Sequence, residues 1–101
     1  MIHVIATIQL KPGTRVEFLE IFNANVPAVL AEDGCHGYVP TIDVEANLDP
    51  QQQDENSVVV VEAWESVDHL HAHLKAPHML EFREKAGHMI EGLSLRVLQQ
   101  G

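Results

Sequence analysis

Residues 58–66 read VVVVEAWES, and two histidines, His73 and His78, follow them. Four consecutive valines are typical of a strand covered on both sides, because successive side chains point to opposite faces of a sheet. Ser66 is a suitable N-cap for a helix that begins after this strand. The segment therefore predicts a buried strand over residues 58–65, followed by a helix that brings imidazoles back past the end of the strand.

The amino-terminal part predicts a strand and a long helix. Residues 1–10 alternate in the manner of a strand, and Lys11-Pro12-Gly13 ends it with turn residues. Thr14 and Glu17 match a capping box at the start of the helix. Its apolar positions recur at spacings of three and four residues: Phe18, Leu19, Phe22, Val26, Val29 and Leu30.

Two residues are expected to shape the end of this helix. Pro27 lies within the apolar pattern and should kink or divide the helix near Asn25. Gly34 is expected to adopt the left-handed conformation past the last turn.

The remaining elements complete an alternating order. We expect a second strand over residues 38–44 and an exposed hairpin loop over residues 47–56, which contain Pro50 and three consecutive glutamines. The second helix should be interrupted at Pro77, and the last strand should cover residues 93–99. This β-α-β-β-α-β order predicts one domain, residues 1–101, of the α+β class, with a ferredoxin-like four-stranded antiparallel sheet and both helices on one face.

The valine-rich strand also bears on assembly. An antiparallel sheet needs only one covered face, yet residues 58–61 are apolar on both. We therefore expect the helix-free face to meet a second copy in a twofold homodimer.

Composition excludes several classes of partner. The formal charge is −9, from 15 acidic and 6 basic residues, which disfavours nucleic acid and anionic membranes. No apolar run approaches the ~20 residues of a membrane span, and no secretory signal precedes the first strand, so we expect a cytoplasmic location. The one cysteine, Cys35, excludes an intrachain disulfide and a cysteine-rich metal site.

Several motifs together resemble the antibiotic biosynthesis monooxygenase family. Residues 32–38 (EDGCHGY) are similar to its acidic-Gly-Cys segment, and residues 62–66 (EAWES) to its strand-end tryptophan motif. His73 matches a mid-helix histidine, and Pro77-His78 matches the break that follows. Asp33 departs from the pattern, because the family often has proline there. Related haem-degrading enzymes use an asparagine in the first strand, and residues 1–10 contain none, which disfavours a haem role.

The resemblance implies a protomer whose dimer closes into an α+β barrel. It also implies a reaction without metal or flavin, in which an electron-rich phenol or quinol is deprotonated and itself reduces dioxygen. The protein would supply an apolar pocket, orientation and a proton acceptor.

On this basis the predicted catalytic residues are His73 and Trp64, and the predicted substrate contacts are Tyr38, His78 and Phe82. Imidazole suits base chemistry near neutral pH. Each residue also has a structural interpretation. Trp64 either lines the cavity or fills the core, Tyr38 either rims the pocket or anchors the sheet, and a helical histidine is often a surface residue.

Other residues suggest structural roles. A metal site formed by His69, His71 and His73 would need a strand, where all three align. A helix keeps His69 and His73 on one face and turns His71 away from them, so we predict no metal. Cys35 is expected to be a small buried apolar residue. Glu62 lies on the same strand face as Trp64 and would need a partner if buried, for which Arg96 is a candidate.

Three functions remain open from the sequence. The first is a cofactor-independent monooxygenase acting on a small quinol or polycyclic phenol. The second is a non-catalytic dimer that binds a small ligand. The third is an isomerase or lyase that acts on a small carbonyl metabolite by proton transfer alone.

Overall fold

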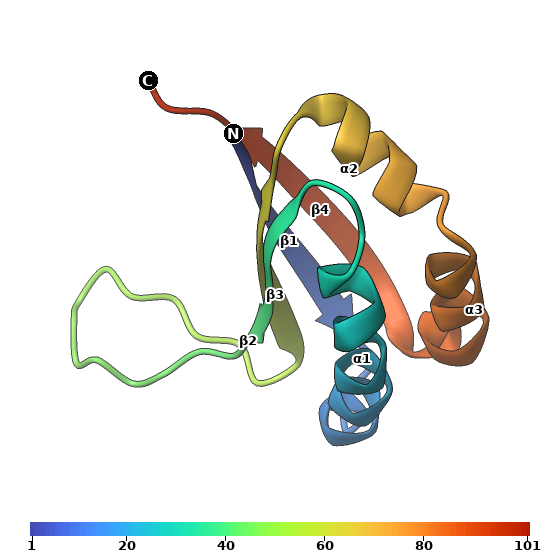
Figure 1. Cartoon of the computed structure of the whole chain (residues 1–101). Coiled ribbons are helices and arrows are strands. Elements are labelled where there is room, and N and C mark those ends of the chain that lie inside the picture. Colours follow the sequence, from blue (N-terminus) through green and yellow to red (C-terminus); the bar gives the residue numbers. More distant parts are fainter.

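A computed structural model describes all residues, 1–101, and has the predicted order of strands and helices. The elements are β1 (Ile2–Leu10), α1 (Arg15–Leu30), β2 (Cys35–Thr41), β3 (Ser57–Trp64), α2 (Val67–Leu74), α3 (Pro77–Ala86), a single 3-10 turn (Gly87–Met89) and β4 (Ile90–Leu98). The strands form one antiparallel sheet in the order β2-β3-β1-β4. The three helices lie on one face of it (Figure 1), which confirms the predicted α+β ferredoxin-like fold.

Alternation along the two central strands decides which side chains meet the helices. Every second residue of β1 is buried, and Ala6 and Ile8 pair with Val60 and Val58 of β3. The helices cover this face with large aromatic side chains. Phe18 and Phe22 of α1 and Phe82 of α3 have ring centroids within 5.8 Å of one another. Burial of each such ring contributes roughly 1.5–3 kcal/mol, so this cluster fixes both helices on the sheet.

The opposite face of the sheet carries no helix (Figure 1). We call it the helix-free face. Its central row crosses all four strands and comprises Val39, Val61, Ile5 and Arg96. Val61 is 42% exposed and Val39 is 54% exposed. The two-sided apolar character predicted for the third strand is therefore present.

Some predicted boundaries were wrong by a few residues. The second strand begins at Cys35 and ends at Thr41, because the chain pairs with β3 immediately after the turn at Gly34. The last strand begins at Ile90, because β1 is nine residues long and pairs with β4 to its end, where Leu10 meets Ile90.

The first helix departs from its prediction at two residues. Pro27 does not divide α1, which continues to Leu30. Pro27 and the residue four before it, Asn23, are both exposed, so water can satisfy the carbonyl that loses its N–H partner. Thr14 forms no side-chain cap, because its hydroxyl donates to the carbonyl of Lys11 at 2.7 Å. Gly34, by contrast, has the expected left-handed conformation, with φ +78°.

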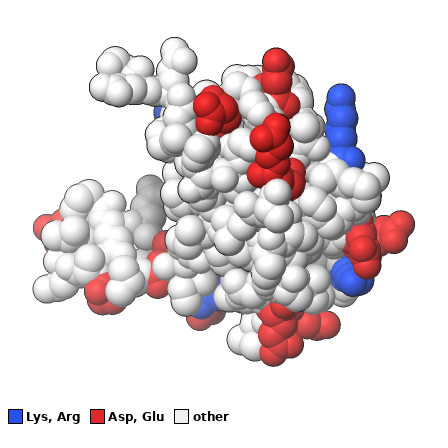
Figure 2. All heavy atoms as spheres, in the orientation of Figure 1, with Lys and Arg blue, Asp and Glu red and all other residues white.

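The segment between β2 and β3 forms an exposed loop, as predicted, and projects away from the sheet (Figure 1). Acidic side chains are distributed over the visible surface, with few basic ones among them (Figure 2). None of the helices is long and apolar enough to cross a membrane.

Candidate functional site

His73 reaches the interior because Ser66 sets the start of α2. The Ser66 hydroxyl accepts a hydrogen bond from the backbone N–H of His69, the expected N-cap interaction. Two turns later His73 points towards the sheet and is only 2% exposed. Its ring lies against Trp64, with 4.6 Å between the ring centroids. The predicted return of an imidazole past the end of β3 is confirmed.

A small cavity lies between the sheet and the helices. Its volume is about 210 Å³. The lining is mostly apolar and comes from all four strands and three helices: Ala6, Ile8, Phe22, Tyr38, Val60, Glu62, His73, Leu74, Met79, Phe82, Arg83, Ile90, Leu93 and Leu95. An apolar pocket with a few polar groups is the usual form of a small-molecule site.

The two nitrogens of His73 have different surroundings. Nδ1 lies 2.8 Å from Oε2 of Glu32, in the turn after α1. Nε2 makes no bond to Glu32 and is the nitrogen left for a ligand. Burial lowers the pKa of His73 from its ordinary value of 6.5, although the bond to Glu32 acts in the opposite direction. The ring is therefore a neutral base at pH 7.

Glu62 provides a second titratable group in the same cavity. It is 6% exposed, and its Oε1 accepts a hydrogen bond of 2.9 Å from the indole N–H of Trp64. Burial raises the pKa of Glu62 from 4.5 to about 7, with the indole bond opposing the shift. The proposed pairing with Arg96 was wrong, because Arg96 pairs with Ile5 and lies on the helix-free face.

Aromatic rings complete the wall of the cavity. Tyr38 stacks on Phe22 at 5.3 Å and meets His73 edge-on at 5.4 Å. Burial raises the pKa of Tyr38 well above its ordinary value, so its phenol stays neutral. Phe82 reaches the cavity from α3.

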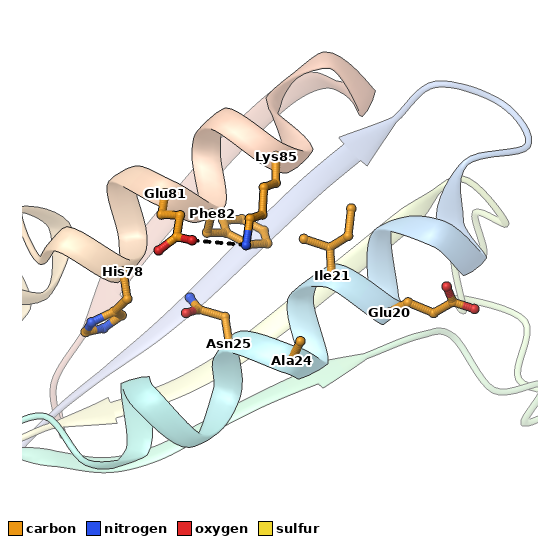
Figure 3. A pocket seen from close by; sticks show the side chains of 8 residues that line it. All are labelled: Glu20, Ile21, Ala24, Asn25, His78, Glu81, Phe82 and Lys85. Carbon is orange, nitrogen blue, oxygen red and sulfur yellow. Dashed lines mark ion pairs between the residues drawn. The ribbon is translucent and has the colours of Figure 1, made fainter.

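The structure brings most of the predicted site residues together. His73, Tyr38 and Phe82 line the cavity. Trp64 is fully buried behind them and is not among the lining residues, so it contacts His73 and Glu62 instead. His78 also lies outside the cavity, in a groove of about 460 Å³ between α1 and α3 (Figure 3).

Sequence reasoning missed Glu32 as a site residue and gave Glu62 only a structural role. Glu32 bonds to His73 and His78, which lie 41 and 46 positions further along the chain. No local sequence pattern indicates contacts between residues so far apart. The sequence does contain one indication for Glu62. Burying a carboxylate on a strand face beside a tryptophan costs free energy of folding, so such a residue usually has a partner or a function. Arg83, which also lines the cavity, gave no signal.

Among the three histidines of α2, His71 points away from the other two, as expected for a helix, while His69 and His73 both lie beside the turn that contains Glu32 and Asp33. His71 is exposed, His69 bonds to the cap Ser66, and His73 points inward. No three His, Cys, Asp or Glu side chains are grouped so as to hold a metal ion. Cys35 is half-buried, and burial raises the pKa of its thiol.

Comparisons with known proteins agree with this architecture. The family model described as antibiotic biosynthesis monooxygenase matches residues 1–85. The chain is 42% identical to Probable quinol monooxygenase YgiN of Escherichia coli strain K12, and the match covers 100% of this chain and 99% of that protein.

Solved structures are similar over nearly the whole chain. Rv0793 from Mycobacterium tuberculosis is 25% identical with a TM-score of 0.80, and the match covers 99% of this chain and 94% of that one. PA3566 from Pseudomonas aeruginosa is 23% identical with a TM-score of 0.81, and the match covers 99% of this chain and 93% of that one.

Proposed function

Because the chain belongs to the antibiotic biosynthesis monooxygenase family, we propose that it oxidises a small quinol with dioxygen and needs neither metal nor flavin. The observation that carries the proposal is the pairing of two groups at one apolar cavity. Neutral His73 offers a free Nε2, and the Glu62 carboxyl has a pKa of about 7. Deprotonation of a quinol needs a neutral base such as His73, and loss of water from a peroxide needs an acid such as the Glu62 carboxyl.

The size of the cavity favours a single substituted ring. Its volume is about 210 Å³, and an apolar cavity of about 150 Å³ accommodates benzene. A quinol with one or two small substituents fits this space. The polycyclic phenol that the sequence left open requires a wider pocket.

In the proposed reaction His73 acts first. Its Nε2 accepts a proton from a quinol hydroxyl, and the resulting quinolate transfers one electron to dioxygen. The semiquinone and superoxide then combine to form a carbon–oxygen bond. Burial of the site favours the proton transfer, because the quinolate is held by a fixed imidazolium rather than by water.

Glu62 acts in the second half. The peroxide O–O bond breaks, the proton on the same ring carbon leaves with the outer oxygen as hydroxide, and a carbonyl forms. Glu62 protonates the hydroxide to water, and the proton held by His73 returns Glu62 to its neutral form. One quinol and one dioxygen thus give one hydroxylated quinone and one water, and the substrate supplies all the electrons.

The remaining predicted residues support these two groups. Trp64 holds Glu62 through its indole N–H and packs against His73, so we propose that it orients both. Tyr38 and Phe82 provide aromatic surface for the substrate ring. Trp64→Phe should therefore reduce turnover by releasing Glu62, with less effect on substrate affinity.

A base and an acid at one cavity also suit the isomerase or lyase that the sequence left open. The two functions differ in oxygen consumption, since proton transfer alone uses none. A non-catalytic ligand-binding dimer would bind quinols and convert nothing.

The test is oxygen uptake by chelator-treated protein supplied with single-ring quinols, corrected for spontaneous oxidation. We expect one dioxygen consumed per quinol. His73→Ala should reduce turnover by about 10²-fold or more, the lower range for loss of a positioned general base. His71→Ala, on the exposed face of the same helix, is the matched control and should retain the wild-type rate. Equal turnover by wild type and His73→Ala would exclude His73 as the base.

We also propose that the protein works as a homodimer joined through the helix-free face. The apolar centre of that face, Val39, Val61 and Ile5, supports a second copy as the partner. A cytoplasmic location stays a prediction from the sequence.

A further inference from the structure

One oxygen of Glu32 joins three separate parts of the chain. Nδ1 of His73, on α2, and Nε2 of His78, on α3, each lie 2.8 Å from Oε2 of Glu32, in the turn after α1. The Glu32 side chain is only 13% exposed. Hydrogen bonds to an enclosed carboxylate are stronger than those between neutral groups, so this contact holds both rings in place.

The carboxylate also decides where the hydrogens of both rings are. An ionised carboxylate can only accept, so each ring nitrogen that faces it has to carry a hydrogen. For His73 this puts the hydrogen on Nδ1. A neutral ring then has its lone pair on Nε2, the nitrogen that makes no bond to Glu32. That tautomer is the one that a base at the cavity requires.

His78 belongs to the outer groove and not to the cavity. It lines the groove with Asn25, Glu81, Lys85 and others, and 27% of its side chain is exposed (Figure 3). Glu81 pairs with Lys85 at 3.1 Å. The hydrogen-bonded link from His78 to His73 therefore runs through Glu32.

We propose that Glu32 and His78 are positioning residues that hold His73 as its Nδ1–H tautomer. The catalytic part of this inference rests on the proposed function. The charged and titratable groups around His73 are Glu32, His78, Arg83, Glu62 and Tyr38. Burial has the largest effect on the pKa of His73 and lowers it. Glu32 raises this pKa, whereas His78 and Arg83 lower it.

Glu32→Gln tests the charge of the carboxylate. The amide oxygen can still accept both hydrogen bonds, but it cannot stabilise the imidazolium that forms in the reaction. We expect kcat to fall about tenfold or more, with KM changed by less than about twofold. The acidic limb of the kcat profile should move to lower pH, because Glu32 raises the pKa of His73.

Two variants of His78 separate positioning from substrate contact. His78→Ala should lower kcat about tenfold and move the acidic limb to higher pH, the opposite direction from Glu32→Gln. His78→Gln, whose amide N–H can donate to Glu32, should recover most of the rate. Glu81→Gln is the groove control and should behave as wild type. If both His78 variants raise KM and leave kcat unchanged, His78 contacts the substrate and the proposal is wrong.

The tautomer itself can be measured without turnover. Nitrogen-15 NMR of the imidazoles should report Nδ1–H for His73 in wild type and Glu81→Gln, and a mixture of tautomers in Glu32→Ala and His78→Ala. An Nε2–H tautomer in wild type would overturn the proposal even if quinols are oxidised. If the wild-type protein oxidises no quinol, the proposed function is wrong. Loss of Nδ1–H in Glu32→Ala and His78→Ala would in that case still support the positioning role.

Discussion

At the scale of single residues, one physical cause acts in opposite directions on the two groups of the cavity. Burial disfavours charge, so it lowers the pKa of His73 and raises that of Glu62. The first remains a neutral base at pH 7, and the second keeps its proton to unusually high pH. Such divergence between neighbouring groups is typical of acid–base sites.

The raised pKa of Glu62 makes a prediction about stability. Between its unfolded value of 4.5 and its folded value of about 7, the folded state binds more protons than the unfolded state. The stabilisation is complete below pH 4.5 and is lost as pH rises through about 7. One pKa unit corresponds to about 1.4 kcal/mol, so the loss is roughly 3 kcal/mol.

Glu62→Gln does not titrate and should escape this loss. The free energy of unfolding of the variant relative to wild type should therefore increase from pH 4 to pH 8 by up to about 3 kcal/mol. His73 contributes the opposite trend but is present in both proteins. Urea titrations at several pH values measure the difference, and a constant difference across the range would contradict the burial argument.

The residues of the site differ in how far the sequence could predict them. His73, Tyr38 and Phe82 could be predicted to lie at the cavity from the helical spacing after Ser66 and from the family resemblance. Glu32 could not, because its role arises from a turn that meets two helices distant in sequence. His78 was predicted as a substrate contact, and its position in the groove points to an indirect role.

At the scale of elements, the turn between α1 and β2 determines where Glu32 lies. Gly34 has φ +78°, and a Cβ there would come within 2.3 Å of the His69 ring on α2. Its carbonyl accepts a hydrogen bond of 2.8 Å from the backbone N–H of Glu65, at the end of β3. The turn is thus packed between α2 and the sheet.

Gly34→Ala should be strongly destabilising for two separable reasons. The left-handed conformation alone costs an alanine about 1–2 kcal/mol, and the clash with His69 adds to it. Gly13 is a matched control, with φ +82° and no atom within 4 Å of a Cβ, so Gly13→Ala should cost only the first part. In a His69→Ala background the loss for Gly34→Ala should become smaller but stay above that for Gly13→Ala, because the Cβ of residue 69 remains 3.0 Å from the added methyl group. Equal losses for Gly13→Ala and Gly34→Ala in wild type, measured by thermal unfolding, would show that the contact with His69 is unimportant.

The elements were predictable where one local signal dominates. Ser66 caps α2 and Pro77 begins α3 as expected, because each has a single backbone role there. Thr14 and Pro27 were misread, because a nearby carbonyl and solvent exposure decided their effect. The ends of β2 and β4 depend on how far the neighbouring strand extends. The residues next to a strand end in the sequence carry no information about that length.

At the scale of the whole molecule, the sheet has one face covered by helices and one free. The row Val39, Val61 and Ile5 runs across the free face, flanked on one side by the row that contains Gly37 and Ala63. Small and branched side chains suit packing against another sheet, which lies at about 10 Å in face-to-face pairs. A chain of this length buries a smaller fraction of its surface alone than a larger protein does, so pairing would add to its stability.

Val61→Glu should therefore separate the two copies without disturbing the cavity, which opens on the other face of the sheet. We expect sedimentation at micromolar concentration to give about twice the chain mass of 11.2 kDa for wild type and the chain mass for the variant. Val16→Glu is the matched control, because Val16 is 75% exposed on α1 and lies outside the helix-free face. It should remain dimeric, since a charge there meets only water. A wild-type protein that sediments as a monomer, or a Val61→Glu variant as dimeric as Val16→Glu, would show that the helix-free face is not the interface.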